Sequence, residues 1–487
     1  AGAAIAATAD RAATWLRSPC LGLCERAPAA LVTIAGEEPR STAIGPVDAV
    51  GIARRLRAGD ERENAADARA AVPQAGSAGL RLLARAGVAN PERLSDYRAN
   101  GGYRALERAL RIGPAAVVDE VTASKLVGRG GAAFPTGRKW AAVAAAPGQP
   151  HYLVCNADES EPGTFKDRVL MEHDPFAVVE SMTIAAFAVG ASRGYLYLRG
   201  EYPLAERRMS LAIASARDDG LLGPDIRGSG FGFDIEIRRG AGAYICGEET
   251  ALFESIEGKR GEPRNKPPFP VEVGLFGKPT AVNNVETLVN VPLILADGGA
   301  AFAGIGTDAS TGPKLFCLSG NVARPGVYEV PFGTTLRQLI ELGGAVAGGR
   351  AIKAILLGGA AGVFVGPETL DTPLTFEATR AIGATLGSGV VMVFDDTADL
   401  VGALRRIARF FRDESCGQCV PCRVGTVRQE ELLARLASGG SDGSAQTDLA
   451  LLGEIGRAMR DASICGLGQT ASSAIESALR QPELVSL

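Results

Sequence analysis

The sequence predicts a multidomain protein of the α/β and α+β classes, and three observations support this prediction. Its 487 residues are too many for one ordinary hydrophobic core, so several domains are expected. Apolar strand-like runs alternate with helical runs between residues 97 and 312, which predicts a parallel sheet flanked by helices. From Ala398 onward, apolar residues recur at helical spacing, which predicts a helical domain.

Before this α/β pattern, residues 61–96 are charged and then rich in Ala, Gly and Pro, which predicts a linker. Within the α/β pattern, strands are expected at residues 151–155, 194–198 and 234–238. Helices are expected at residues 97–110, 115–126 and 182–191, and a further helix follows Pro203 and ends at Ala216. Residues 313–396 predict a small β-rich unit, with strands expected at 315–318, 326–330, 352–357 and 390–394 and a helix at 335–342. The helical domain is expected at residues 397–487.

Near its N-terminus the chain carries two cysteines, Cys20 and Cys24, before a strand expected at 30–34 and a helix at 47–57. Two thiolates would leave a pair of irons half-coordinated, and no other cysteine occurs before Cys155. A vestigial or truncated cluster site is therefore favoured, and a working [2Fe–2S] cluster is not expected from this chain alone.

A glycine-rich stretch, Gly128–Trp140, could bind a phosphate. Its glycines let backbone N–H groups approach an anion, and Lys139 adds a positive charge. The stretch follows a helical pattern where a dinucleotide fingerprint would follow a strand, so that common interpretation is disfavoured. A phosphate site and a plain turn both remain open.

A polar stretch, Asn156–Arg168, follows directly after the strand expected at residues 151–155 and contains four acidic residues. The carboxyl ends of parallel strands are where α/β sheets place ligand groups. We therefore favour a ligand site over a solvated loop with helix caps.

Three later stretches each allow a structural and a functional interpretation. Gly240–Thr250 brings glycines and two acids to a strand-to-helix junction, which suits helix capping as well as ligand binding. Arg264–Pro270 is stiffened by three prolines and is either a surface loop or a rigid holder for Lys266 and Phe269. Thr280–Thr287 supplies two adjacent carboxamides.

Cys416, Cys419 and Cys422 are separated by two residues each, and Cys465 follows later. Three sulfurs from one loop and a fourth from elsewhere form the ligand set of a [4Fe–4S] cluster. Zinc is the alternative, although structural zinc sites usually combine two pairs of ligands. A disulfide fits poorly because closely spaced cysteines favour a shared metal.

Composition excludes several classes of protein. The net charge is −4 with acids and bases interspersed, so we expect no nucleic-acid partner. No apolar run approaches about 18 residues, so we expect no direct membrane insertion. The start of the chain lacks the order of a signal peptide, and the cysteines suit a reducing compartment, so a cytoplasmic location is expected.

Taken in order, these motifs resemble the flavin subunit of respiratory complex I and the diaphorase subunits of NAD-reducing hydrogenases and NAD-dependent formate dehydrogenases. The resemblance covers residues 97–487. It implies a Rossmann-like FMN and NAD(H) domain at 97–312, a ubiquitin-like β-grasp domain at 313–396 and a helical [4Fe–4S] domain at 397–487. Residues 1–60 resemble the second half of a thioredoxin-like [2Fe–2S] domain whose first cysteine pair is absent.

The resemblance also implies roles for individual residues. The FMN-binding residues would be Gly128, Gly130, Lys139, Asn156, Asp158, Glu159, Gly247, Glu248, Glu249, Asn283 and Asn284. The residues of the NAD(H) pocket would be Phe134, Glu161, Tyr244, Lys266 and Phe269, with Glu161 and Glu249 orienting the nucleotide. No catalytic acid, base or nucleophile is implied. The chain departs from the family pattern at Ala133, where glycine is frequent, and near Ala142, where an aromatic residue is frequent.

Within the family, three stretches most resemble the β subunit of NAD-dependent formate dehydrogenase: Pro19–Cys24, Tyr197–Pro203 and Asp461–Gln469. The partners would then be iron–sulfur subunits and a molybdenum or tungsten catalytic subunit that oxidises formate. After formate dehydrogenase, the diaphorase subunit of a hydrogenase is the second choice and the flavin subunit of complex I is the third. NAD(H) exchanges two electrons and a cluster one, so a flavin has to lie between them. The competing class is a scaffold that carries a cluster beside an inactive flavin pocket.

Overall fold

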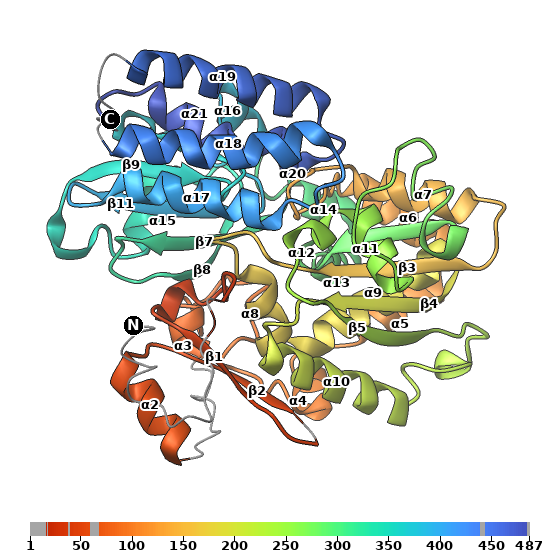
Figure 1. Cartoon of the computed structure of the whole chain (residues 1–487). Coiled ribbons are helices and arrows are strands. Elements are labelled where there is room, and N and C mark those ends of the chain that lie inside the picture. The colour runs from red at the N-terminus through yellow and green to blue at the C-terminus, as the bar shows by residue number, and fades with distance from the viewer. Residues whose placement is uncertain (1–15, 17, 38, 59–67, 439–443, 485–487) are drawn as a thin grey trace.

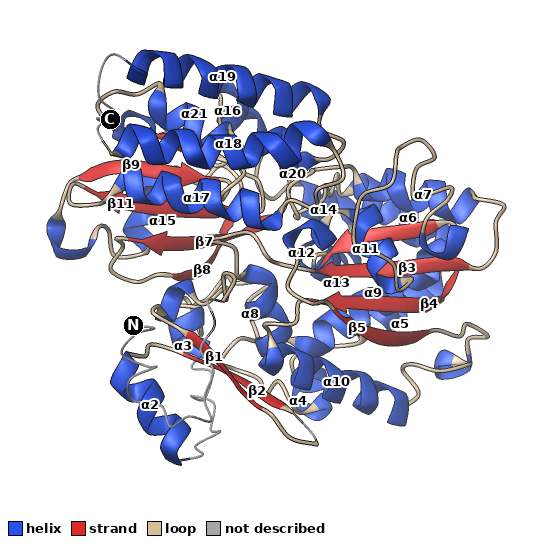
Figure 2. Cartoon of the chain, viewed as in Figure 1, coloured by secondary structure: helices blue, strands red, loops and turns tan. Residues whose placement is uncertain are grey.

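The computed structural model describes residues 16, 18–37, 39–58, 68–438 and 444–484. In Figure 1 the helical C-terminal domain lies over a mixed sheet, the parallel-sheet domain lies beside both, and the N-terminal hairpin lies below them. Figure 2 shows the same arrangement by type of element, with helices on the parallel sheet. The α/β and α+β multidomain class is confirmed.

The N-terminal unit is an antiparallel hairpin followed by one helix. The strand predicted at residues 30–34 is β1 (Ala30–Ile34), and it pairs with β2 (Arg40–Ile44). The predicted helix is α2 (Ala49–Ala58), and the cysteine segment contains a short turn, η1 (Cys24–Arg26).

Residues 68–93, which lie within the expected linker, pack onto the neighbouring domains. They contain a short helix, α3 (Ala68–Ala71), and Val72 and Leu83 are buried in the core of the α/β domain. The carboxylate of Glu329 accepts hydrogen bonds of 2.8 and 2.9 Å from the backbone N–H groups of Arg81 and Leu83. A composition rich in Ala, Gly and Pro therefore marks an irregular but anchored segment here.

A four-stranded parallel sheet forms the centre of the α/β domain. Its strand order is β5-β4-β3-β6, from β3 (His151–Ala157), β4 (Ala191–Leu198), β5 (Asp234–Arg239) and β6 (Thr280–Asn284). The first three strands were predicted, whereas β6 was not. Its helices and short turns are α4 (Leu94–Ala99), α5 (Arg104–Ile112), α6 (Pro114–Ala123), α7 (Thr136–Ala145), α8 (Lys166–His173), α9 (Pro175–Val189), α10 (Pro203–Asp218), η2 (Ile226–Gly228), η3 (Tyr244–Gly247), α11 (Glu249–Ile256), η4 (Leu275–Gly277), α12 (Val285–Val289), α13 (Val291–Asp297) and α14 (Gly299–Ala303).

Helix α9 is the apolar support of this sheet. It begins with Pro175 at its first position and ends at Gly190, whose φ of 69° is the left-handed conformation that closes helices. Almost all of its residues are buried, because β3 and β4 cover one side and other helices cover the rest.

The single helix predicted at residues 97–110 is two helices, α4 and α5. Tyr103, at the start of α5, has a left-handed φ of 65°, and Gly101 has a φ of 89°. The adjacent glycines allow this break, which the apolar spacing did not reveal.

The five-stranded sheet of residues 313–395 has the β-grasp arrangement. Its last strand lies in the middle, parallel to the first strand on one side and antiparallel to the third on the other. The order is β10-β9-β11-β7-β8, and the elements are β7 (Pro313–Gly320), β8 (Gly326–Pro331), α15 (Leu336–Leu342), η5 (Ala347–Gly349), β9 (Ile352–Leu357), β10 (Val363–Val365), η6 (Pro367–Thr369), α16 (Phe376–Ala381) and β11 (Val390–Asp395). The short strand β10 was not predicted.

The C-terminal domain is helical, as predicted. It consists of α17 (Leu400–Glu414), α18 (Val420–Ala437), α19 (Ser444–Ala462), α20 (Gly466–Thr470) and α21 (Ser473–Leu479). Its apolar side chains share one core with β3, η3 and α11 of the α/β domain. This shared core holds the cysteine loop in a defined position relative to the sheet.

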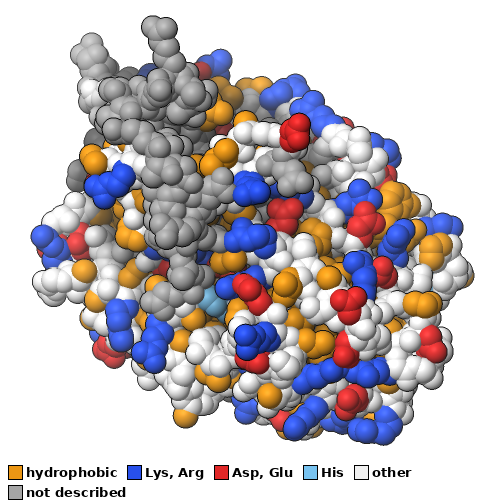
Figure 3. Space-filling model, turned by 90° about the horizontal axis from the view of Figure 1, so that it is seen from below, with side chains coloured by type: hydrophobic (Ala, Val, Ile, Leu, Met, Phe, Trp, Pro, Cys, Tyr) orange, Lys and Arg blue, Asp and Glu red, His pale blue; other side chains and the backbone are white. Residues whose placement is uncertain are grey.

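Among the described residues, no helix is both long and apolar enough to cross a bilayer. On the face seen in Figure 3, Lys and Arg side chains are interspersed with Asp and Glu. This distribution agrees with the charge pattern of the sequence.

Candidate functional site

Two asparagines meet at the carboxyl edge of the parallel sheet. The register between β3 and β6 places Asn156 beside Asn284. The glycine-rich loop lies against this point, because a Cβ atom on Gly130 would lie 3.1 Å from Asn284 Cβ. Any larger residue at position 130 would push the loop away from the sheet edge.

The turn η3 joins the same edge. Asn156 Nδ2 donates a 2.8 Å hydrogen bond to Gly247 O, and a Cβ on Gly247 would lie 3.4 Å from Asp158 Oδ2. This oxygen is buried and has no hydrogen-bond partner among the described residues. Burial raises the pKa of Asp158 to about 7. A buried acceptor beside a glycine is a place where a polar ligand can bind.

Lys139 connects the glycine-rich loop to the opposite wall. Its Nζ donates a 2.7 Å hydrogen bond to Val282 O in β6 and lies 5.8 Å from the ring centroid of Phe134. Burial lowers the pKa of Lys139, and the nearby charge of Glu249 opposes that effect. The partly buried ammonium group of Lys139 therefore lies between residues predicted to bind FMN and Phe134, which is predicted to line the NAD(H) pocket.

Lys266 forms ion pairs with two neighbouring carboxylates. Its Nζ lies 2.7 Å from Glu248 Oε1 and 3.2 Å from Glu249 Oε1. The other oxygen of Glu248 caps α11, accepting hydrogen bonds from the N–H groups of Thr250 and Ala251 at 2.9 and 3.0 Å. Glu248 therefore caps the helix, as the structural interpretation of this stretch predicts, and also faces Lys266.

Three aromatic residues of the predicted nucleotide pocket lie in different surroundings. Phe134 and Phe269 are 45% and 54% exposed, so their rings are accessible to a ligand. Tyr244 packs against Phe410 of α17 with ring centroids 5.0 Å apart, and its backbone N–H donates to Glu414. Tyr244 thus lies where the sheet edge meets the helical domain.

Three predicted flavin residues are engaged in internal contacts. The carboxylate of Glu159 accepts hydrogen bonds from two N–H groups at the start of α8. Asn283 accepts from Trp140 Nε1 at 2.9 Å, and Asn284 donates to Asp167 at 2.6 Å. These side chains shape the walls of the region from behind.

Glu161 reaches across to the β-grasp domain. Its carboxylate accepts a 2.9 Å hydrogen bond from the N–H of Ala361, and Gly359 leaves the room it needs, because a Cβ there would lie 2.5 Å from the carboxyl carbon. Burial raises the pKa of Glu161 to about 7.

A buried network of charges was missed from the sequence. Lys166 pairs with Asp167 at 2.8 Å and with Glu286 at 3.0 Å, and Glu286 also pairs with Lys314 at 2.8 Å. All four side chains are almost fully buried. Lys314 was the available signal, because it stands at the start of an otherwise apolar strand.

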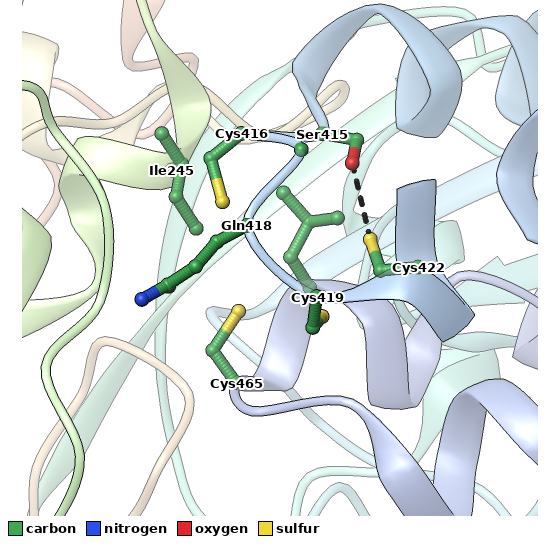
Figure 4. Close-up of a pocket in the computed structure, with 9 residues that line it drawn as sticks. Ile245, Ser415, Cys416, Gln418, Cys419, Cys422 and Cys465 are labelled. Atoms are coloured by element: carbon green, nitrogen blue, oxygen red, sulfur yellow. Dashed lines mark hydrogen bonds between the residues drawn. The ribbon is translucent and has the colours of Figure 1, made fainter. Parts of the chain in front are cut away.

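The four predicted metal-ligand cysteines line one pocket. Figure 4 shows the sulfur atoms of Cys416 and Cys465 pointing toward each other across it, with Ile245 closing one side. Cys419 and Cys422 complete the lining of this pocket. The structure therefore brings together a loop and a distant helix start, as the spacing predicted.

Helix starts supply backbone donors at this pocket. Cys419 and Cys465 are the cap residues of α18 and α20, so their sulfurs lie at the positive ends of two helices. The N–H groups of Leu467 and Gly468 donate to the sulfur of Cys465, while burial raises its pKa. Burial also raises the pKa of Cys422 to about 11. Bound iron would reverse these shifts and hold the thiolates.

Of the two metals considered, the ligand arrangement favours a cluster. Three thiols from one loop and a fourth from a distant helix start line one pocket, and in a cluster the irons and sulfides separate such protein ligands. Structural zinc sites usually combine two pairs of ligands around one atom.

Only one residue separates the two halves of the site along η3. Ile245 lines the cysteine pocket, whereas Gly247 lies beside Asp158 at the sheet edge. The turn thus connects the candidate flavin site directly to the candidate cluster site.

Similarity to known proteins agrees with this geometry. Residues 121–293 match the model of the Nuo51 FMN-binding domain, residues 402–483 that of the NADH-ubiquinone oxidoreductase-F iron-sulfur binding region, and residues 315–360 that of the SLBB domain. The chain is 48% identical over 402 residues to a subunit of the NADH-quinone oxidoreductase of Rhizobium meliloti, covering 82% of this chain and 94% of the relative. The chain belongs to the family of flavin subunits of these NADH oxidoreductases.

Other members of this family come from hydrogenases. NADP-reducing hydrogenase subunit HndC of Solidesulfovibrio fructosivorans is 46% identical, covering 82% of this chain and 81% of the relative. A crystal structure of NAD+-reducing [NiFe]-hydrogenase in the H2-reduced state matches with a TM-score of 0.79 and 37% identity, covering 96% of this chain and 76% of that chain. Family membership assigns FMN and a [4Fe–4S] cluster as cofactors and NADH as substrate.

Proposed function

We propose that this chain is a diaphorase subunit that passes electrons between NAD(H) and a partner subunit. The observation that carries this proposal is the turn η3, which lines the cysteine pocket with Ile245 and the sheet-edge site with Gly247. Bound FMN would exchange a hydride with nicotinamide and single electrons with the cluster. The protein then has to position these groups and exclude water.

The sheet edge supplies the groups that would hold FMN. Lys139 and the N–H groups of the glycine-rich loop would bind its phosphate, because a cation and backbone donors converge there. The free oxygen of Asp158 and the bare backbone of Gly247 would meet polar groups of the flavin. Asn156 would hold Gly247 in place.

The nucleotide would lie on the exposed side of the flavin. Phe134 and Phe269 offer exposed rings for stacking, and Glu161 and Glu249 would orient the dinucleotide by accepting hydrogen bonds. Lys266 would offset the charge of Glu249 near the pyrophosphate.

No histidine takes part in this proposal. The ring nitrogens of His151 lie 2.7 Å from Val189 O and 3.0 Å from Ala146 O, so the ring ties β3 to its neighbours. Hydride transfer at a flavin requires no protein acid or base, which agrees with this arrangement.

The surface beside the cluster suits a protein partner. Gly417, at the tip of the cysteine loop, lies between Arg260 and Arg423, which donate to the carbonyl groups of Cys416 and Gly417. On the first turns of α18 an apolar stripe, Val420, Val424 and Val427, is 57%, 47% and 38% exposed. An iron–sulfur subunit with an apolar patch and acidic rim would complement this surface.

The favoured partner set is that of an NAD-dependent formate dehydrogenase, in which a molybdenum or tungsten subunit oxidises formate and this chain reduces NAD+. Two of the stretches that suggest it touch each other, since Arg199 donates to the carbonyl of Cys20. One alternative is a hydrogenase, supported by the likeness to the NAD+-reducing [NiFe]-hydrogenase over 96% of this chain. The other is complex I, supported by the 48% identity to the NADH-quinone oxidoreductase subunit. Nine free cysteines suit a cytoplasmic location for either complex.

Purification of the chain with its native partners tests these proposals. Absorption bands near about 370 and 450 nm and reduction by NADH are expected for bound flavin. A preparation with full iron but without these bands would favour the scaffold alternative. Molybdenum or tungsten with formate-dependent NAD+ reduction would support the formate assignment, whereas nickel with hydrogen-dependent reduction would replace it.

A further inference from the structure

The N-terminal cysteine segment packs against the back of the flavin site. We call residues Pro19–Arg26 the arm. Two arginines of the α/β domain hold its backbone, because Arg168 Nε donates to Gly22 O at 3.0 Å and Arg199 donates to Cys20 O. The arm precedes β1, which lies below α8 in Figure 1.

Both arginines also hold Glu159, the first residue of the segment Glu159–Arg168, which we call the flavin segment. Arg199 Nη1 donates a 3.0 Å hydrogen bond to the carbonyl of Glu159. The backbone N–H of Arg168 donates to the carboxylate of Glu159 at 2.9 Å. Tyr202 completes the connection, because its hydroxyl lies 3.1 Å from Glu159 O and fills the space beside Gly22. The arm is therefore one contact away from the sheet-edge site.

Glu25 is the charged anchor of the arm. Its carboxylate lies 2.6 Å from Arg168 Nη2, and each side chain is only 1% exposed. Arg168 also pairs with Glu172 at 2.7 Å. Removal of the Glu25 charge would leave Glu172 as the carboxylate paired with Arg168, so the guanidinium would lose its tie to the arm and could shift toward Glu172.

The cysteines of the arm take part in packing. Cys24 is partly buried and packs against the core of the α/β domain, and the backbone N–H of Gly163, in the flavin segment, partly opposes the rise that burial gives to its pKa. The truncated cluster motif therefore packs against the α/β domain.

We propose that the arm positions the flavin segment Glu159–Arg168, and that Glu25 is a positioning residue acting through Arg168. The inference rests on the proposed function, because it assigns this segment to the flavin. The proposed function requires that FMN binds. This inference concerns how tightly the chain binds FMN and the reduction potential of the bound flavin.

The test compares Glu25→Gln with Glu37→Gln in the whole complex. Gln keeps the shape of Glu25 and removes its charge, and Glu37 is an exposed residue of the same N-terminal unit. After removal of FMN, the dissociation constant for added FMN is measured by flavin fluorescence, and the two-electron midpoint potential of bound flavin by redox titration. We expect Glu25→Gln to weaken FMN binding about tenfold, within the usual range of coupling between linked sites, and to shift the potential. Glu37→Gln should change neither.

A purely structural role would give a different result. A lower melting temperature for Glu25→Gln, with unchanged FMN affinity and potential, would overturn the proposal. If Glu25→Gln fails to assemble, Glu25→Asp retains the charge at a longer distance from Arg168, and an intermediate loss of FMN affinity is expected; unchanged affinity would again overturn it. Failure of the wild-type complex to bind FMN would instead refute the proposed function.

Discussion

Lys266 Nζ donates a 2.7 Å hydrogen bond to Glu248 Oε1 and so joins the proline-rich loop to the start of α11. Burial alone would raise the pKa of Glu248, and hydrogen bonds from Lys266 and Thr250 reverse this effect and lower it. Glu248 is therefore held as a carboxylate beside Glu249. This lysine and the donors at the start of α11 together offset the two adjacent negative charges at the proposed dinucleotide site.

Replacement of Lys266 by Gln should weaken the binding of NADH. Without the ammonium group, the two carboxylates would repel the pyrophosphate, and loss of one charge-assisted contact corresponds to about a tenfold rise in KM. The measurement is NADH-driven reduction of ferricyanide. Lys259→Gln is the control, because Lys259 forms similar ion pairs but is 60% exposed. Equal KM values for the two variants would contradict the role of Lys266.

The stability of the flavin-free protein should fall as the pH rises through about 7. Burial raises the pKa of Asp158 to about 7, whereas the unfolded carboxyl loses its proton near about 4. The native state therefore binds more protons in this window, and the stability that this group contributes is fully present below about pH 4 and lost as the pH passes 7. Asp158→Asn should flatten part of the slope of melting temperature against pH. Glu159 and Glu161 shift in the same direction, so some slope should remain. An identical slope in the variant would show that Asp158 is not buried as described.

Lys139→Gln should release FMN. Lys139 is partly buried and hydrogen-bonded to Val282 O, so its charge is held at one place beside the glycine-rich loop. A charge-assisted contact to phosphate is worth about 1.5–3 kcal/mol, so the dissociation constant of FMN should rise about 10- to 100-fold. Flavin content after gel filtration reports this change. Arg138→Gln removes a neighbouring exposed charge and should retain the flavin; loss of flavin from both variants alike would indicate only a general effect of charge.

Much of this site follows from local sequence patterns, and the remainder depends on pairing between distant elements. The spacing of Cys416, Cys419 and Cys422 predicts a shared metal site, because a short loop has few ways to arrange three sulfur atoms. Strand β6 was missed because the segment Thr280–Asn284 is short and partly polar. It is a strand because it pairs with β3, which lies far away in the sequence. No local pattern could show this.

The buried charges show the same limit. Lys166 and Glu286 lie 120 residues apart, and nothing in either stretch reveals that the folded chain brings their charges within 3.0 Å. The same holds for residues 68–93, within the linker expected at 61–96, because their anchoring depends on Glu329 in the β-grasp sheet. Composition reports how easily a segment bends and carries no information about what it contacts.

Cys419→Ser should separate the two halves of the electron path. A serine hydroxyl is a poor ligand for iron, so the cluster should be lost or altered, and NADH-driven reduction of the partner should cease. Small dyes that accept electrons from the flavin itself should still be reduced. Glu431→Ser, at an exposed position of α18 outside the pocket lining, is the control and should retain both activities. Equal loss of dye reduction and partner reduction in Cys419→Ser would contradict the proposed order of carriers.

Val424→Asp should weaken the attachment of the iron–sulfur partner. Val424 is 47% exposed in the middle of the stripe that begins one residue after Cys419, a proposed cluster ligand. A carboxylate there would be desolvated on docking and would repel the acidic rim expected opposite Arg423, so the affinity should fall about tenfold or more. Co-purification of the partner and its rate of reduction by NADH are the measurements, with ferricyanide reduction as the internal reference. Val88→Asp introduces the same charge at a 58% exposed valine far along the chain and should leave the complex intact. If Val424→Asp retained the partner as firmly as Val88→Asp does, the docking surface would have to lie on another face of the helical domain.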